Sequence, residues 1–334
     1  MWKHRTRATV ALAALALTVA GCSSTGGAQQ DSSDGSTSGG GGGGVDTGAD
    51  YTVAMVTHAP AGDTFFDIIR AGADEASAET GIEYTYANSD QPNEQATLIQ
   101  NAVDSQVDAI AVSMPNVPAL SEALGNAADA GIPVFAFNAG LSEYEDVGAL
   151  AYFGQDESIA GGAAGERLTE EGAQNVLCVL QAQGQSQLEA RCDGVADAFS
   201  GTVEKIYVTG TDLPSVQSTI TAKLAEDPSI DTVLTLGAPF ALTAVQSVDE
   251  AGSEAQVVTF DTNAELVGAI EDGDVTWAVD QQPFLQGYEA IDAAYLYLTN
   301  GNVLGGGEPV LTGPAFVDSD NVADVAAYAE AGTR

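Results

Sequence analysis

From residue 50 onward, the sequence predicts an α/β protein made of two doubly wound, Rossmann-like lobes. Short runs rich in β-branched residues alternate with longer amphipathic runs, and most short runs are apolar on both faces, as in a buried parallel sheet. Strand then helix, repeated, is typical of a doubly wound fold. The halves also repeat each other through three matched pairs, at offsets of 122, 123 and 121 residues: Pro92 and Pro214, Asp108 and Asp231, Gly131 and Gly252.

Nine segments are expected to form strands, because they are short, rich in β-branched residues and followed by helical or turn-forming sequence. These segments are 51–57, 82–87, 108–114, 132–138, 175–181, 203–208, 232–236, 256–261 and 275–279. Apolar residues keep helical spacing in 98–103, 216–224 and 288–298. Four prolines are expected at the first position of a helix, where a missing N–H costs nothing: Pro92, Pro118, Pro214 and Pro239.

The first 49 residues predict export and a tether. Lys3, Arg5 and Arg7 precede an apolar stretch over 8–20, which is too short to span a bilayer as a helix. This stretch ends in small residues before Cys22, as in a bacterial lipobox. We therefore expect a lipoprotein signal peptide over 1–21, lipid on Cys22 and a flexible Gly/Ser-rich tether over 22–49. The alternative is an ordinary secretory signal with an incidental cysteine.

Composition excludes several classes of function. The chain has 9 basic and 48 acidic residues, and removal of the signal leaves six basic residues and a formal charge near −42. A field of this sign repels nucleic acid and anionic lipid head groups. His58 is the one histidine after the signal, and no Cys/His spacing or activated nucleophile is present. We therefore expect no enzyme, no catalytic residue, no metal and no cofactor.

Two cysteines remain after lipidation, Cys178 and Cys192. An exported protein is in a compartment where disulfides persist, so one bridge closing a modest loop is expected. The alternative is two buried small apolar side chains.

Five motifs in a fixed order carry a family resemblance. They are 88–96 (Asn-Ser-Asp-Gln-Pro-Asn-Glu-Gln-Ala), 108–115 (Asp-Ala-Ile-Ala-Val-Ser-Met-Pro), 130–138 (Ala-Gly-Ile-Pro-Val-Phe-Ala-Phe-Asn), 258–261 (Val-Thr-Phe-Asp) and 281–287 (Gln-Gln-Pro-Phe-Leu-Gln-Gly). Together they resemble the periplasmic sugar-binding proteins of ABC importers, the ribose-binding and LacI-related group with the type I fold. The repressor branch needs an N-terminal helix-turn-helix, and here a signal and tether stand in its place. The resemblance therefore favours transport.

The resemblance implies three crossings between the lobes, near 153–154, 281–282 and 311–313. The N-lobe would then comprise 50–153 with 282–311, and the C-lobe 154–281 with 312–334. Three connecting strands make a hinge that closes around a ligand. The implied partners are an ABC permease and its ATPase, with the protein acting as a monomer that touches the membrane through the Cys22 lipid only.

Candidate ligand contacts in the N-lobe lie after its strands. Phe65 and Phe66 resemble an aromatic pair in the family that covers the apolar face of a sugar, although Phe65 is also in phase with core positions. Asn138 matches a family position that contacts hydroxyl groups, and its amide can both donate and accept. Its alternative role is an Asx turn.

In the C-lobe, Asp261 is expected to accept hydroxyl hydrogen bonds, with an N-cap for the helix from Ala264 as its alternative. Gln281 matches the hinge amide of the family. One of Glu189 and Arg191 is expected to reach the cleft, and each is otherwise an exposed helix charge.

The C-lobe also departs from the family pattern. Relatives carry an Asn-Asp pair after the strand over 232–236, whereas this chain has Gly237-Ala238-Pro239-Phe240. Trp277 is either another aromatic platform or core. We therefore expect a lipid-anchored receptor for a neutral monosaccharide or sugar alcohol. The alternative is the same fold binding a nucleoside, an autoinducer-type furanose or a cationic metabolite, for uptake or sensing.

We expect Cys22→Ala to release the protein from membranes. Two or three acyl chains hold a protein firmly on a bilayer, whereas one chain alone is marginal. Fractionation of cells into membrane and medium measures the effect. Recovery of the unaltered protein wholly in the medium would contradict the lipobox interpretation.

Overall fold

The computed structural model describes residues 50–334. The predicted signal peptide, the lipidation of Cys22 and the tether all fall on residues 1–49, outside the described part. Within residues 50–334, no helix has the length and apolar character needed to cross a membrane.

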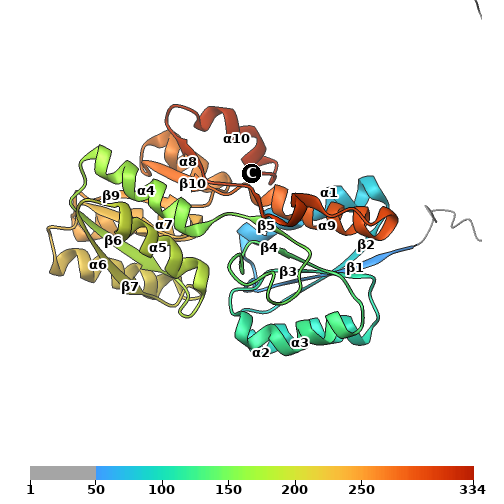
Figure 1. Ribbon diagram of the computed structural model, residues 1–334. Helices are drawn as coiled ribbons and strands as arrows, with labels where there is room; N and C mark the ends of the chain where they lie inside the picture. Colours follow the sequence, from blue (N-terminus) through green and yellow to red (C-terminus); the bar gives the residue numbers. More distant parts are fainter. Residues whose placement is uncertain (1–49) are drawn as a thin grey trace, which may run out of the picture. The chain divides into compact units, whose positions relative to one another are not determined.

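The first half of the fold is a six-stranded parallel sheet in the order β11-β5-β4-β3-β1-β2. Helices α2 and α3 cover one face of this sheet, and α1 and α9 cover the other (Figure 1). The elements are β1 (Thr52–Thr57), α1 (Thr64–Thr80), β2 (Glu83–Asn88), α2 (Pro92–Asp104), β3 (Ala109–Val112), α3 (Val117–Asp129), β4 (Val134–Phe137), β5 (Ala151–Gly154), α9 (Pro283–Asn300), the 3-10 helix η1 (Leu304–Gly307) and β11 (Val310–Leu311).

The second half is a six-stranded sheet in the order β12-β10-β9-β8-β6-β7, parallel except for β12. Helices α4 and α5 pack on one face, and α6, α7, α8 and α10 pack on the other. The elements are α4 (Glu157–Glu171), β6 (Asn175–Leu180), α5 (Ser186–Ala198), β7 (Thr202–Tyr207), α6 (Leu213–Glu226), β8 (Thr232–Thr235), α7 (Ala238–Ala251), β9 (Gln256–Phe260), α8 (Ala264–Asp272), β10 (Trp277–Asp280), β12 (Ala315–Asp318) and α10 (Val322–Glu330).

The predicted fold class is confirmed, and each of the nine predicted segments overlaps most of a strand. The sequence did not predict β5, β11 or β12, which have four, two and four residues and give little pattern to read. Pro92 opens its helix as predicted. The other three prolines were placed one residue too early in their helices, since Pro118, Pro214 and Pro239 are second residues.

The chain passes between the two sheets three times: after β5, after β10 and after β11. The predicted lobe bounds stay a prediction, and the membership of each strand in one sheet or the other supports them. At the second passage Gln282 adopts the left-handed conformation, with φ of 53°. This turn leads directly into α9, which begins at Pro283.

A disulfide ties α5 to the second sheet. Cys178 lies in β6 and Cys192 in α5, with their sulfurs bonded and their Cα atoms 6.1 Å apart. Both side chains are fully buried. The bridge thereby anchors the helix that also carries Arg191.

Glycines allow one pair of helices in each half to approach closely. In the first half, a Cβ on Gly72 of α1 would collide with the Phe284 carbonyl oxygen, and one on Gly287 of α9 would collide with the Ile69 carbonyl oxygen. In the second half, Gly161 of α4 and Gly194 of α5 meet in the same way. In each half, therefore, glycines allow close packing of the helix that follows a passage between the sheets, which is α9 in the first half and α4 in the second.

We expect Gly287→Ala to lower the free energy of unfolding by about 1–3 kcal/mol or more, because overpacking forces the backbones of α1 and α9 apart. Gly125→Ala, in α3, is the matched control, since a Cβ there meets nothing within 4 Å. A helix-interior alanine should stabilise that variant by roughly 0.5–1 kcal/mol. Denaturant unfolding measures both, and equal stabilities would contradict the close-packing interpretation.

Candidate ligand-binding cleft

A cavity of about 810 Å³ opens at the carboxyl ends of strands from both sheets. The loops after β1 and β4 line it from the first sheet, and those after β6, β8 and β9 from the second. Ligands of open α/β folds bind at this edge. The volume lies within the usual range for small-molecule sites, which is about 300–1,000 Å³.

Two residues with positive φ line this cavity, one from each sheet. Asn138 follows β4 with φ of 64°, and Asp261 follows β9 with φ of 66°. The offset between them is 123 residues, within the range of 121 to 123 residues found in the sequence repeat. Asn and Asp tolerate the left-handed region better than other residues with a Cβ. Asp261 is not the N-cap of α8, because Asn263 caps that helix, and the Asn138 amide nitrogen donates to Gln281 and Gln286.

A chain of side-chain hydrogen bonds joins these two residues. Gln281, on the segment after β10, accepts from Asn138 Nδ2 through Oε1 at 3.3 Å and donates from Nε2 to Asp261 Oδ1 at 2.6 Å. Gln286 fixes the position of the Gln281 side chain. Its Nε2 donates to Gln281 Oε1 at 2.8 Å and to Thr312 Oγ1 at 3.2 Å. The chain therefore also reaches the third passage between the sheets.

Arg191 continues the chain on the other side of Asp261. Its guanidinium donates to both carboxylate oxygens of Glu157, from Nε at 2.7 Å and from Nη2 at 2.9 Å. Its Nη1 lies 3.4 Å from Asp261 Oδ2 and 3.2 Å from the Leu236 carbonyl oxygen. The Phe260 ring lies 4.8 Å from the guanidinium carbon. Arg191 is 3% exposed, so its charge is almost fully removed from water. Glu157 and Asp261, both of this chain, balance that charge.

Burial sets the protonation of this cluster. It raises the pKa of Asp261 to about 6, although the Arg191 charge and the Gln281 amide both favour the carboxylate. Burial alone would lower the pKa of Arg191, but Glu157 and Asp261 raise it above its ordinary value. Arg191 therefore stays charged and already has carboxylate partners.

His58 follows β1 and lines the same cavity. Its Nδ1 lies 2.8 Å from Ser113 Oγ, and its Nε2 lies 3.3 Å from Gln187 Nε2 on α5. Burial, with a smaller effect of the Arg191 charge, lowers the pKa of His58 to about 3. The imidazole is therefore neutral at physiological pH and adds no charge to the cavity.

Aromatic rings line the cavity from both sides. Phe65 and Phe66 pack edge to face, with centroids 5.3 Å apart. Phe66 is buried in the core of the first half, and Phe65 packs against its edge. On the other side, the Phe240 ring lies beside Gly210 and Gly237, where a Cβ would come within 3.0 and 3.2 Å of it. Aromatic rings on the wall of a pocket offer flat apolar surfaces against which the carbon atoms of a ligand can pack.

The structure brings six of the seven predicted ligand contacts to this cavity: Phe65, Phe66, Asn138, Arg191, Asp261 and Gln281. Glu189 pairs instead with Lys205 at 3.1 Å, as expected for a helix charge. Trp277 lies in the core of the second half. The assignment of the six as ligand contacts stays a prediction.

Sequence reasoning missed His58, Glu157, Gln181 and Gln187. The repeat pointed to two of them, because His58 and Gln181 follow the first strand of each half at an offset of 123 residues. Glu157 gave no such signal. It pairs with an arginine 34 residues away, and no spacing rule connects them.

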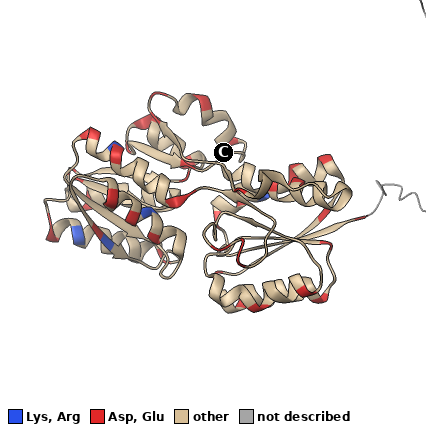
Figure 2. Ribbon diagram, viewed as in Figure 1, with Lys and Arg blue, Asp and Glu red and all other residues tan. Residues whose placement is uncertain are grey.

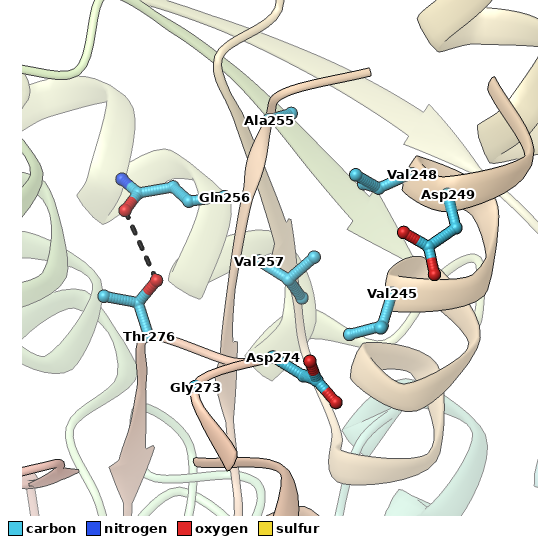
Figure 3. A pocket seen from close by; sticks show the side chains of 9 residues that line it. All are labelled: Val245, Val248, Asp249, Ala255, Gln256, Val257, Gly273, Asp274 and Thr276. Carbon is cyan, nitrogen blue, oxygen red and sulfur yellow. Dashed lines mark hydrogen bonds between the residues drawn. The ribbon is translucent and has the colours of Figure 1, made fainter. Parts of the chain in front are cut away.

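A smaller hollow of about 250 Å³ lies between α7 and the starts of β9 and β10 (Figure 3). Valine side chains, Asp249 and Asp274 line it, and Gln256 and Thr276 are hydrogen-bonded at 3.4 Å. It is at the amino ends of the strands, away from the edge where ligands of this fold class bind. Over residues 50–334, no group of three His, Cys, Asp or Glu side chains forms a candidate metal site.

Acidic residues are spread over the molecule and basic ones are few (Figure 2). Each of the six basic residues in the described part of the chain is paired with a carboxylate. The pairs are Arg70 with Asp67, Arg167 with Glu171, Arg191 with Glu157, Lys205 with Asp193, Lys223 with Glu204 and Arg334 with Asp280. An anionic ligand would therefore have to displace a carboxylate to gain a counter-charge.

A family model described as a periplasmic binding protein domain matches residues 53–302. The chain belongs to this family. It is 25% identical to the xylose/arabinose-binding protein of Sulfolobus acidocaldarius, over 81% of this chain and 72% of that protein. It is 26% identical to the fructose import binding protein of Bifidobacterium longum, over 89% of each.

Among solved structures, a carbohydrate transporter from Acidothermus cellulolyticus 11B, in complex with myo-inositol, is 56% identical with a TM-score of 0.85. The match covers 86% of this chain and 100% of that one. The predicted membership of the sugar-binding proteins of ABC importers is confirmed, as is the prediction that the chain is a binding protein and not an enzyme. The lipoprotein form stays a prediction.

We expect His58 to make the periplasmic binding protein less stable in acid. Its pKa is about 3 when folded, against 6.5 for the free side chain, so the unfolded chain binds a proton first. Stability is then lost as pH falls below 6.5, by about 2 kcal/mol at pH 5. Asp261 acts in the opposite direction, because its raised pKa stabilises the fold as pH falls through about 6.

Wild type and His58→Asn both contain Asp261, so the effect of Asp261 on the unfolding free energy cancels when the two proteins are compared. The difference in unfolding free energy between the two proteins should change by about 2 kcal/mol between pH 7.5 and pH 5. Denaturant unfolding at both pH values measures it. Parallel pH profiles would show that His58 titrates normally in the folded protein.

Proposed function

We propose that the chain is a lipid-anchored extracytoplasmic receptor for a neutral monosaccharide or cyclic sugar alcohol. It captures the ligand between its two lobes and delivers it to an ABC permease driven by its ATPase. The observation that carries this proposal is the hydrogen-bonded chain from Asn138 through Gln281 to Asp261, which lines the cavity beside an arginine that already has carboxylate partners.

A neutral polyol matches this cavity in two respects. Its hydroxyl groups both donate and accept, as the amides and the carboxylate require. Its carbon face fits against the rings of Phe65, Phe66 or Phe240. Myo-inositol is the first candidate, because it is a neutral cyclic polyol and occupies a structure that is 56% identical to this chain.

The three passages between the sheets support the following mode of action. A hinge of three strands lets the lobes close on a ligand that contacts both, and the closed form then presents itself to the permease. The protein acts as a monomer, and the lipid on Cys22 with the tether over 22–49 keeps it near the membrane. A membrane-bound receptor meets the permease without being lost to the medium.

A cationic metabolite is a second candidate. Asp63 and Asp90 line the cavity together with Asp261, and Arg191 is balanced by Glu157. The field in the cavity is therefore negative and favours a cation over an anion.

We expect Asp261→Asn to weaken binding of the neutral ligand about ten- to a hundredfold, because hydrogen bonds to a charged group are worth roughly 1.5–3 kcal/mol. Asparagine keeps the size of the side chain and tolerates the positive φ at 261. Asp274→Ala is the control, since Asp274 lines the smaller hollow. Calorimetric titration against pentoses, hexoses, cyclitols, amino sugars and sugar acids measures affinity. Tight binding of acids alone, unchanged in Asp261→Asn, would refute the neutral-ligand assignment.

A further inference from the structure

Two glutamines that line the cavity each have a buried side-chain oxygen without a hydrogen-bond partner among residues 50–334: Gln181 Oε1 and Gln187 Oε1. Gln181 directly follows β6, and Gln187 lies in the first turn of α5. Gln187 is 7% exposed. Buried side-chain acceptors in proteins are normally paired, so two unpaired ones on one wall need an explanation.

The orientation of Gln181 is set by a backbone group. Its Nε2 donates to the Leu236 carbonyl oxygen at 3.2 Å. A carbonyl oxygen only accepts, so the amide nitrogen must face it and the amide oxygen must point elsewhere. The Gln181 side chain therefore cannot be rotated so that its amide oxygen and nitrogen change places.

The amide nitrogen of Gln187 has two partners within the protein. Its Nε2 lies 3.0 Å from Gln185 Oε1 and 3.3 Å from His58 Nε2. In this arrangement His58 Nε2 accepts, and the imidazole proton is on Nδ1, 2.8 Å from Ser113 Oγ. The oxygen of Gln187 is then the one hydrogen-bonding atom of its side chain left for a ligand.

Gly237 lies beside the Gln181 amide on the same wall. A Cβ on Gly237 would lie 3.7 Å from Gln181 Nε2, in ordinary contact, and 3.2 Å from the Phe240 ring. The amide of Gln181 and the ring of Phe240 are therefore neighbours at the position where this chain departs from the family pattern.

We propose that Gln181 and Gln187 each accept a hydrogen bond from a ligand hydroxyl, and so select ligands that carry hydroxyl groups at two particular positions. The inference rests on the proposed function, because it assumes a neutral polyol in this cavity. Analogues with fluorine, an ether oxygen or a carbonyl at these positions cannot donate. A site built to bond a hydroxyl rejects such analogues strongly, because its own buried group is left unpaired.

Calorimetric titration with myo-inositol and its monofluoro analogues, in which fluorine replaces one hydroxyl, tests the proposal. We expect fluorination at two positions to weaken binding by about ten- to a hundredfold and fluorination elsewhere to have a smaller effect. Gln181→Met should abolish the penalty at one position and Gln187→Met the penalty at the other. Gln217→Met, on α6 outside the cavity, should leave the pattern unchanged.

Two results separate failure of this inference from failure of the proposed function. Polyol binding with equal penalties at all positions, in wild type and both variants, would overturn the inference alone. Absence of binding to myo-inositol and to every other neutral polyol would overturn both.

The imidazole tautomer gives a test that needs no ligand. The full chain has two histidines, His4 and His58, so its ¹⁵N imidazole spectrum is simple and His58→Asn assigns it. We expect the His58 proton on Nδ1. A proton on Nε2 would require the Gln187 oxygen to face His58, which would overturn its role as a ligand acceptor.

Discussion

The hydrogen bond from Gln281 Nε2 to Asp261 Oδ1, at 2.6 Å, is the interaction on which the cleft depends. Gln281 is on a segment that connects the two sheets. Its amide oxygen accepts a hydrogen bond from Asn138, which follows β4 of the first sheet. Asp261 belongs to the second sheet and contacts Arg191. Any change in the relative position of the sheets must therefore alter this chain of bonds. A ligand that contacted Asn138 and Asp261 would therefore act on a segment that connects the two sheets.

Charge in this molecule is arranged differently inside and outside the cleft. The surface is strongly acidic, which serves solubility more than it specifies the fold. Inside, a buried arginine is matched by two carboxylates and supported by the Phe260 ring. A buried charge is tolerated only when it is paired, and here the pairing is complete without a ligand. The cluster therefore holds the Asp261 carboxylate in a fixed place and leaves Arg191 no unpaired charge toward the cavity.

The fold could be predicted because strand and helix periodicities are strong and the two halves repeat. The strands β5, β11 and β12 could not, since each lies next to a passage between the sheets, where the alternation of strand and helix is interrupted. In the site, Asn138 and Asp261 were recognisable from their places after strands. Glu157 was not, because its pairing with Arg191 arises from the packing of α4 on α5. His58 and Gln181 do have a signal in the sequence, because they occupy equivalent positions of the repeat. Each directly follows the first strand of its half.

The left-handed backbone at Asn138 and Asp261 limits how a cleft of this kind can change. A side chain with a branched Cβ is strongly disfavoured there, so asparagine, aspartate and glycine are the substitutions that leave the backbone unstrained. An unstrained substitution at either position therefore exchanges an amide for a carboxylate, or the reverse, or removes the polar group by placing glycine there. Divergence towards ligands of other shapes is thereby directed to the wall around Gln181, Gly237 and Phe240, where extended and helical backbone accepts many residues.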